Sequence, residues 1–119
     1  MLKFIFSWIF ILLSIGCASN QFNPSWQYKI ENSLGAVNVL ELNEYQTKSK
    51  LLQVNFNVKN ESNVTKKIRY KVVWFDNNQQ PVETILSNWK NVNISSNNIV
   101  YLTAIAPNES VSSYKILIN

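Results

Sequence analysis

Two segments in the middle of the chain alternate between apolar and polar residues. Between Leu52 and Val58 every second residue is apolar, and between Ile68 and Trp74 the apolar residues again fall on alternate positions. A period of two is typical of a β-strand that buries one face and exposes the other. The pattern therefore predicts strands over residues 51–59 and 67–75, the second of which becomes apolar on both faces toward its end.

Shorter apolar segments, separated by turn-forming residues, continue this pattern along the chain. The connectors are rich in Asn, of which the chain has 18, and Asn serves turns that glycine serves elsewhere. Further strands are expected over residues 26–31, 36–42, 99–106 and 113–118, while residues 84–94 fit either a strand or one helical turn before a strand. We therefore predict an all-β fold, an antiparallel immunoglobulin-like β-sandwich of about six or seven strands.

The start of the chain differs from everything that follows. Lys3 precedes an apolar run of 13 residues, Phe4 to Gly16, which ends directly before Cys17. This order is that of a signal peptide. As a helix the run would span roughly 20 Å, against the roughly 30 Å of a bilayer core. Because it is too short to cross a membrane, residues 1–16 are predicted to be a cleaved signal peptide.

The end of this leader resembles the lipobox of bacterial lipoproteins, in which a cysteine receives a diacylglyceryl group and a peptidase cuts just before it. Gly16 fits the small residue required there, whereas Ser14 stands where leucine is usual. The resemblance implies acyl chains on Cys17 that hold the mature chain to a membrane, since each buried methylene contributes about 0.8 kcal/mol. Residues 17–25 then form the lipidated cysteine and its tether, and residues 26–119 form the β-sandwich domain.

The chain is mildly basic. Its formal net charge is +4, and loss of Lys3 with the leader would reduce this to +3. Outside the cytoplasm a basic domain meets anionic lipid headgroups or surface polymers, so we expect no nucleic-acid partner. Ala18, rather than Asp, follows the cysteine, which favours the periplasmic face of the outer membrane as the location.

The residue types exclude the commonest catalytic and metal-binding arrangements. The chain has no His, and Cys17 is its single cysteine, so Ser-His and Cys-His nucleophilic pairs and zinc sites built on His and Cys are excluded. The seven carboxylates are scattered, and nothing in their spacing indicates the pair roughly 5–10 Å apart that a glycosidase needs. A plain turn explains Asp76 and Asn78 better than a calcium loop does. We therefore predict no enzymatic activity, no cofactor and no metal.

Two features are candidates for ligand binding. Lys67, Arg69 and Lys71 share one face of the 67–75 strand and form a basic stripe suited to phosphate-bearing lipid or an envelope polymer. The alternative is a solvated face, or an edge strand that its lysines protect from pairing. Trp89 offers a flat ring for stacking on a sugar, with packing against the sheet as the alternative, whereas Trp74 is expected in the core.

Asn63 is a candidate glycosylation site. It lies in Glu61-Ser62-Asn63-Val64-Thr65, which contains the N-x-[ST] acceptor pattern with an acidic residue two positions before the asparagine. This resembles the preference of bacterial periplasmic N-glycosylation systems of the campylobacter kind. The position between two predicted strands makes the site accessible.

Three short motifs resemble one family of lipoproteins. They are Val72-Val73-Trp74-Phe75-Asp76, then Trp89, then Ala106-Pro107-Asn108 before a final strand. Together with the lipobox they resemble the YcfL-like family of bacterial periplasmic lipoproteins, over roughly residues 51–118. That family usually has a glycine in the turn after the tryptophan-aromatic-Asp run, where this chain has Gln79 and Gln80. No catalytic role is established for the family, so the resemblance implies an envelope location and a β-sandwich rather than an activity.

These features predict a membrane-anchored periplasmic lipoprotein with a non-enzymatic binding or scaffolding role, which presents a sheet face or edge to another envelope protein. The tether raises the effective concentration at the membrane, so weak contact suffices. The alternative is a ligand module for an anionic lipid or envelope glycan that uses Lys67, Arg69, Lys71 and Trp89. The sequence assigns no oligomeric state.

The anchor gives a first prediction. Cys17→Ser removes the thiol that would accept the lipid, so we expect the chain to move to the soluble fraction or to keep its leader. Membrane fractionation followed by mass spectrometry of the N-terminus measures both outcomes. Ser19→Ala is the matched control, because it keeps the thiol. Unchanged membrane attachment of the Cys17→Ser chain would contradict lipidation.

Overall fold

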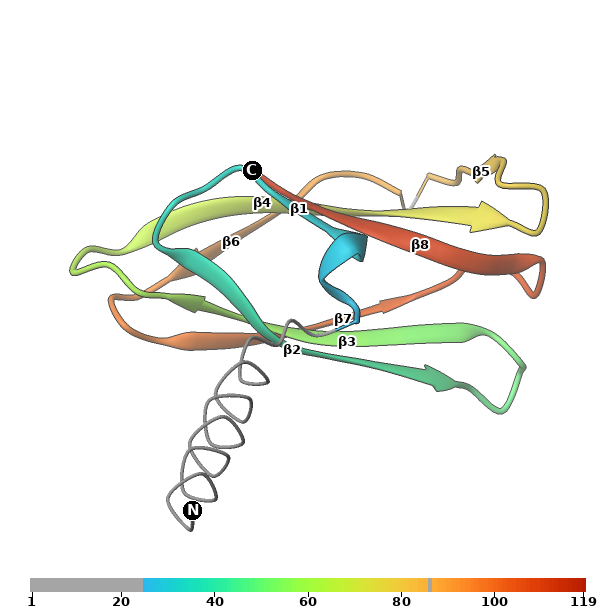
Figure 1. Ribbon diagram of the computed structural model, residues 1–119, viewed down its shortest axis with the longest axis horizontal. Helices are drawn as coiled ribbons and strands as arrows, with labels where there is room; N and C mark the ends of the chain where they lie inside the picture. Colours follow the sequence, from blue (N-terminus) through green and yellow to red (C-terminus); the bar gives the residue numbers. More distant parts are fainter. Residues whose placement is uncertain (1–24, 86) are drawn as a thin grey trace, which may run out of the picture.

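The computed structural model describes residues 25–85 and 87–119. Within these residues the regular structure consists of strands, apart from one short 3-10 turn, η2 (Gln27–Lys29). The strands form two sheets that lie face to face, with the chain crossing between them several times (Figure 1). The predicted all-β fold is therefore confirmed, with eight strands in the described residues where about six or seven were expected.

The larger sheet, here called sheet A, is built around one long central strand. In spatial order it contains β1 (Ile30–Asn32), β8 (Val111–Ile118) and β4 (Lys66–Asp76), and then both β5 (Pro81–Val82) and β6 (Lys90–Ile94), which pair with different parts of β4. The pairs within sheet A are antiparallel except β1 with β8, which is parallel. The sequence pattern did not indicate that parallel pair.

The smaller sheet, sheet B, has three strands in the order β2 (Val37–Gln46), β3 (Leu52–Asn60) and β7 (Ile99–Ile105). Both of its pairs are antiparallel. The register of β2 with β3 shifts between Val39 and Glu41, whereas the register of β3 with β7 is unbroken over seven residue pairs. The central strand of sheet B is therefore β3, and β2 and β7 are its two edges.

The strand expected over residues 36–42 extends further, to Gln46, and two other expected segments begin with a local turn instead of a strand. In the first expected strand, residues 27–29 form the 3-10 turn, and only Ile30–Asn32 is extended. In the ambiguous segment 84–94, Ser87 N donates to Thr84 O at 3.0 Å, and the strand begins only at Lys90. In both segments the first residues form a local turn, and the residues that follow form a strand that pairs within sheet A.

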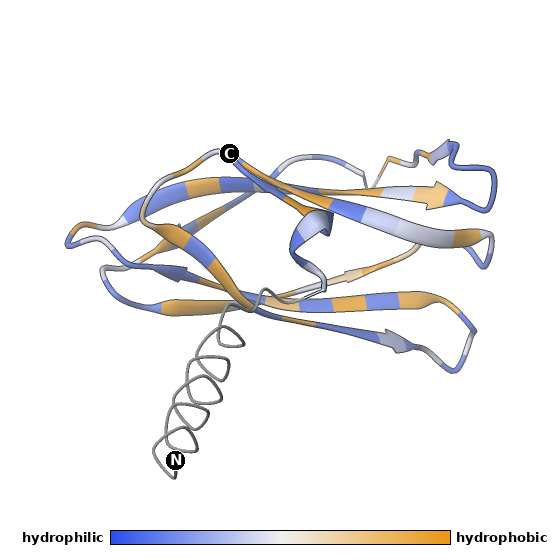
Figure 2. Ribbon diagram, in the orientation of Figure 1, coloured by the Kyte–Doolittle hydropathy of each residue, from blue (hydrophilic) through white to orange (hydrophobic). Residues whose placement is uncertain are grey.

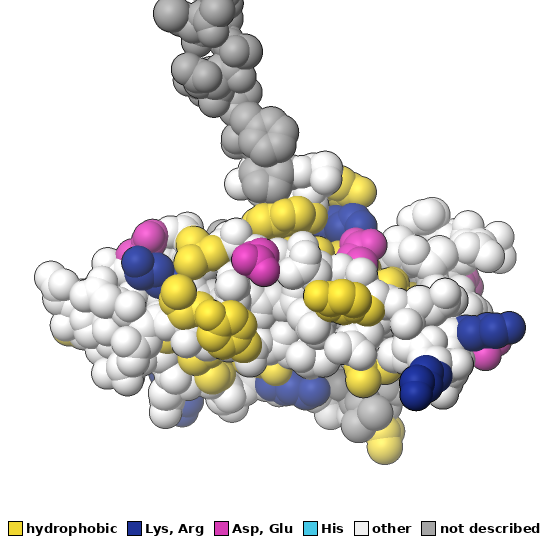
Figure 3. Space-filling view, turned by 90° about the horizontal axis from the view of Figure 1, so that it is seen from below, with side chains coloured by type: hydrophobic (Ala, Val, Ile, Leu, Met, Phe, Trp, Pro, Cys, Tyr) yellow, Lys and Arg dark blue, Asp and Glu magenta, His cyan; other side chains and the backbone are white. Residues whose placement is uncertain are grey.

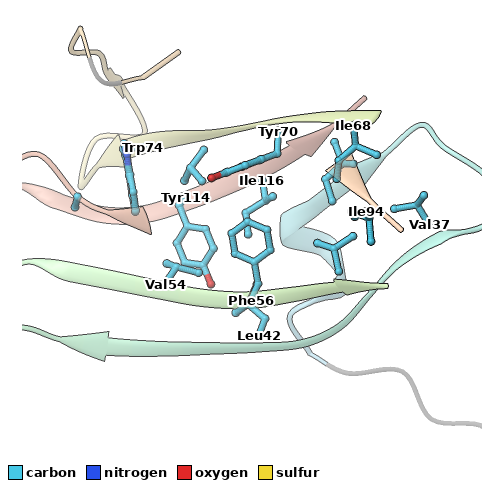
Figure 4. Close-up of a cluster of buried hydrophobic side chains, with 14 of the residues drawn as sticks. Val37, Leu42, Val54, Phe56, Ile68, Tyr70, Trp74, Ile94, Tyr114 and Ile116 are labelled. Carbon is cyan, nitrogen blue, oxygen red and sulfur yellow. The ribbon is translucent and has the colours of Figure 1, made fainter. Parts of the chain in front are cut away.

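The core lies between the two sheets and is formed by the inward-facing residues of the alternating strands. Figure 2 shows this alternation of apolar and polar residues along the ribbons, and Figure 4 shows the side chains meeting between the sheets. Ile68, Ile116 and Val54 are fully buried, and the Phe56 and Tyr70 rings meet edge to face with centroids 5.8 Å apart. Burial of this apolar surface is the main stabilising contribution.

One buried polar residue fixes the loop between β3 and β4. Asn60 is fully buried, and its Nδ2 donates to Val64 O at 2.7 Å and to Ile94 O at 2.8 Å. Its Oδ1 accepts hydrogen bonds from the Ser62 backbone N–H and hydroxyl. The side-chain amide is thus hydrogen-bonded at both ends, as a buried amide must be to avoid a net cost, and it joins sheet B to the end of β6.

A charged cluster joins the two sheets at the N-terminal end of the described chain. Tyr114 reaches from β8 toward sheet B (Figure 4) and donates its hydroxyl to Glu44 Oε2 at 2.5 Å. Lys29 Nζ lies 2.6 Å from the same oxygen and 4.8 Å from the Tyr114 ring centroid. The hydrogen bond from Lys29, followed by that from Tyr114, lowers the pKa of Glu44, while burial and the Glu44 contact raise the pKa of Tyr114.

The turn after β4 contains a strained residue. Gln79 has a backbone φ of 63°, in the left-handed region that glycine adopts without steric cost. The turn is closed by Asp76, whose Oδ1 accepts from the backbone N–H groups of Asn78 and Gln80. Glutamine at this position therefore has a structural cost that glycine would avoid.

The strain at Gln79 gives a second prediction. Gln79→Gly is expected to stabilise the domain by about 1 kcal/mol, because relief of the left-handed strain exceeds the entropy cost of glycine. Thermal or denaturant unfolding measures the change. Gln80→Gly is the control: its φ is not positive, so the same substitution should leave stability unchanged or reduce it. A loss of stability in Gln79→Gly would contradict the assigned turn.

The Glu44 cluster gives a third prediction. A carboxyl group whose pKa is lower in the folded state stabilises that state above the unfolded pKa, and the contribution disappears as the pH falls through the folded pKa. We therefore expect acidification below the ordinary value of 4.5 to remove a contribution of less than about 1 kcal/mol, since the side chain is partly exposed. The free energy of unfolding should depend less steeply on pH in Glu44→Gln than in Glu83→Gln when both are measured across this pH range. Equal slopes in the two variants would count against the cluster.

Candidate binding surfaces

The predicted basic stripe lies on the outer face of sheet A. Lys67 and Arg69 are exposed, whereas Lys71 is half-buried. Their strand, β4, has β8 on one side and β6 on the other, so the interpretation of these cations as protection for an edge strand is wrong. Asn93 and Asn91 of β6 lie directly beside Lys67 and Arg69, and neutral neighbours leave the positive charge of the stripe uncompensated across this pair of strands.

Trp89 joins this stripe in space, although it is distant in sequence. The Arg69 guanidinium lies 4.8 Å from the Trp89 ring centroid, a cation–π distance, and the Trp89 side chain is 38% exposed. The structure thus brings together two of the four residues predicted to bind an anionic ligand. Trp74 is buried and lies beside Tyr114, as expected of a core residue.

Asn63 lies on the surface in the loop between β3 and β4. Its side chain is exposed, and the buried amide of Asn60 holds the loop on either side of it. Both Asn63 and Thr65 are exposed, so an enzyme could reach the acceptor sequence in the folded domain. Glycosylation itself remains a prediction.

Most carboxylates of the described chain serve local structure. Glu31 pairs with Lys115 at 2.5 Å, Glu61 accepts from Asn38, and Asp76 closes its own turn. Within residues 25–85 and 87–119 no group of three or more acidic, His or Cys side chains could hold a metal ion. In the same residues no helix is long and apolar enough to cross a membrane, and the leader and Cys17 lie outside them.

An unprotected sheet edge is the feature that sequence analysis missed. Strand β7 has the sequence Ile-Val-Tyr-Leu-Thr-Ala-Ile and pairs with β3 on one side only. Its alternate residues Ile99, Tyr101 and Ile105 are exposed, with Tyr101 at 79%. The inward residues between them pack against the core. Hydrophobic alternation revealed the strand, but only its place in the sheet reveals that it is an edge.

The other edge strands of the described chain each have a feature that discourages pairing. These features are Glu31 in the three-residue β1, the irregular register and carboxylates of β2, Pro81 in β5, and Lys90 in β6. Short length, charge, proline and bulges are the usual ways in which sheet edges avoid association. Strand β7 has seven residues without charge or proline.

The hydrogen-bonding direction along β7 follows from its two ends. Ala106 N donates to Leu52 O at 2.8 Å, and Asn60 N donates to Asn98 O at 3.0 Å, so the even-numbered residues point their backbone groups toward β3. Successive residues in a strand point these groups to opposite sides. The N–H and C=O groups of Tyr101 and Thr103 are therefore directed away from β3, along the open edge.

The fold is similar to two solved structures of low sequence identity. A DUF1425 family member from Shewanella sp. pv-4 is 20% identical, with a TM-score of 0.64 over 70% of this chain and 76% of the other. Campylobacter jejuni cj0090 is 18% identical, with a TM-score of 0.61 over 75% of this chain and 92% of the other. At these identities the likeness shows the fold alone. No curated protein matches the chain.

The family assignment comes from the sequence of the folded domain as a whole. The model of a family described as "Protein of unknown function (DUF1425)" matches residues 27–119, which include the 3-10 turn and the strands of both sheets. The match begins within the predicted domain and after the predicted tether. The chain therefore belongs to the DUF1425 family.

Proposed function

We propose that this protein is a lipid-anchored, non-enzymatic binding protein of the cell envelope that takes up an extended segment of another envelope protein along the β7 edge. The observation that carries the proposal is the uncharged, regular edge of β7 beside the exposed Ile99, Tyr101 and Ile105 side chains. Addition of a strand to such an edge is a recurring mode of peptide recognition.

The contacts available at this edge define the partner. Backbone groups of Tyr101 and Thr103 offer hydrogen bonds to a partner strand, and the outward Ile99, Tyr101 and Ile105 side chains offer apolar contact beside it. The matching segment is extended, free of proline, and carries apolar residues at alternate positions. A tether at Cys17 would hold the domain near such partners, so an edge of seven residues is sufficient for a weak contact.

Finer assignments belong to the same proposal. The two facing sheets support an immunoglobulin-like plan, and the Trp74, Trp89 and Pro107 motifs support a YcfL-like lipoprotein within the DUF1425 family. The apolar leader that ends at Cys17 supports a cleaved signal peptide and a periplasmic location.

A second candidate function is binding of an anionic lipid or envelope glycan on sheet A. The observation that favours it is the stacked Arg69 and Trp89 pair beside Lys67. Such binding would weaken at high salt and would be lost when Lys67, Arg69 and Lys71 are all changed to Ala.

The edge proposal gives a fourth prediction. With a photoreactive amino acid in place of Tyr101 in the full-length chain, we expect crosslinks in living cells to a defined envelope protein. Thr103→Pro should reduce the yield about tenfold, because it removes an outward N–H and blocks the edge at a position where proline leaves the β3 pairing intact. Thr103→Val is the matched control, since it keeps the N–H and a β-branched side chain.

A photoreactive residue at Asn93, on sheet A, tests the specificity of that crosslink. Absence of adducts from position 101, or equal yields in Thr103→Pro and Thr103→Val, would contradict the edge proposal. Adducts of two copies of the chain would assign the edge to self-association instead. Adducts from position 93 that disappear in the triple Lys67, Arg69, Lys71 variant would favour the function on sheet A.

A further inference from the structure

The outer face of sheet B carries a cluster of side-chain amides that neither the core nor the β7 edge uses. Gln53, Asn55 and Asn57 occupy alternate outward positions on the central strand β3. The strand register places Glu41 and Tyr101 on either side of Asn57, and Asn43 and Thr103 on either side of Asn55. We call these seven residues the amide face. Asparagine is depleted in β-strands, so the folding of β3 does not account for the cluster.

A hollow of about 120 Å³ lies over the centre of the amide face. Its polar side chains are Glu41, Asn43, Asn55, Asn57, Tyr101 and Thr103. Figure 3 shows this side of the molecule: backbone and uncharged polar side chains, drawn in white, cover most of it, with separate hydrophobic and charged groups between them. The face thus differs from the basic stripe on sheet A in the chemistry that it offers.

Some side chains of the amide face hydrogen-bond to one another, and one buried acceptor has no donor. Gln53 Nε2 donates to Asn55 Oδ1 at 3.0 Å, and Asn43 Nδ2 donates to Glu41 Oε1 at 3.1 Å. Asn57 Oδ1 is buried and accepts no hydrogen bond from the described residues. A buried acceptor without a donor is unfavourable, and the Asn57 side chain lines the hollow.

These groups match the chemistry of a sugar. An amide both donates and accepts, as a hydroxyl does, and a carboxylate accepts two or more hydrogen bonds. Tyr101, 79% exposed at the rim of the hollow, supplies a ring that can cover an apolar sugar face. Since Glu41 is the one charged side chain that lines the hollow, the arrangement offers no counter-charge for an anion.

We infer that the amide face binds a neutral saccharide, with Asn55, Asn57 and Glu41 hydrogen-bonded to its hydroxyls and Tyr101 against its ring. This goes beyond the proposed strand capture, which uses backbone groups at the β7 edge rather than the side chains of β3. The two sites adjoin and share the Tyr101 side chain, whereas Asn55, Asn57 and Glu41 belong to the saccharide site alone.

The test is calorimetric titration of the full-length chain, in a detergent without sugar groups, with chitotetraose and with cellotetraose. We expect at least one of these neutral oligosaccharides to bind, with an affinity that 1 M salt leaves within about twofold because no charge pairing is involved. Asn57→Leu should weaken binding at least tenfold, and Tyr101→Ala should weaken it as well. Asn93→Leu, the same change on the outer face of sheet A, is the control and should bind as the parent chain does.

Stability separates a binding role of Asn57 from a structural one. Because its Oδ1 lacks a partner, Asn57→Leu should leave the melting temperature unchanged or raise it while binding falls. Binding of neither oligosaccharide, or equal affinity in Asn57→Leu and the parent chain, would overturn the inference. Asn57→Leu lies on β3 and leaves β7 unchanged. Loss of sugar binding in this variant, with the crosslink from position 101 retained, therefore distinguishes the failure of one proposal from that of the other.

Discussion

The structure depends on the packing of two sheets against each other through their inward-facing apolar side chains. Ile68, Ile116 and Ile118 of sheet A meet Val54 and Val58 of sheet B, and all five are almost completely excluded from solvent. The chain has no cysteine pair within the domain, so packing and its hydrogen bonds must supply the stability that disulfides supply in many small extracellular domains. Asn60 and the Glu44 cluster then fix how the two sheets meet.

Strict alternation explains how much of this fold the sequence predicts. The residues expected on the buried face of the 67–75 segment, from Ile68 to Trp74, are buried, and the cations between them point outward. In a two-layer structure, a period of two predicts directly which residues of a strand face the core. The two-residue strand β5 and the 3-10 turn were not predicted, and β1 was predicted too long, because tertiary pairing rather than local pattern determines segments of two or three residues.

The candidate surfaces were harder to predict, since each depends on which strands become neighbours. Arg69 and Trp89 are 20 positions apart in sequence and stack in space. The amide face requires the register of three strands, and the open edge of β7 requires the strand order of sheet B. A single sequence contains the polar and apolar residues of these surfaces but gives no direct measure of strand order.

Amide hydrogen exchange along β7, followed by NMR in the isolated protein, tests the central claim that two packed sheets leave this edge open. The account predicts an alternation: Leu102 and Ala104, whose N–H groups face β3, exchange slowly, whereas Tyr101 and Thr103, whose N–H groups face outward, exchange fast. Equally slow exchange at all four amides would contradict the account, because it would show that the edge of sheet B is covered.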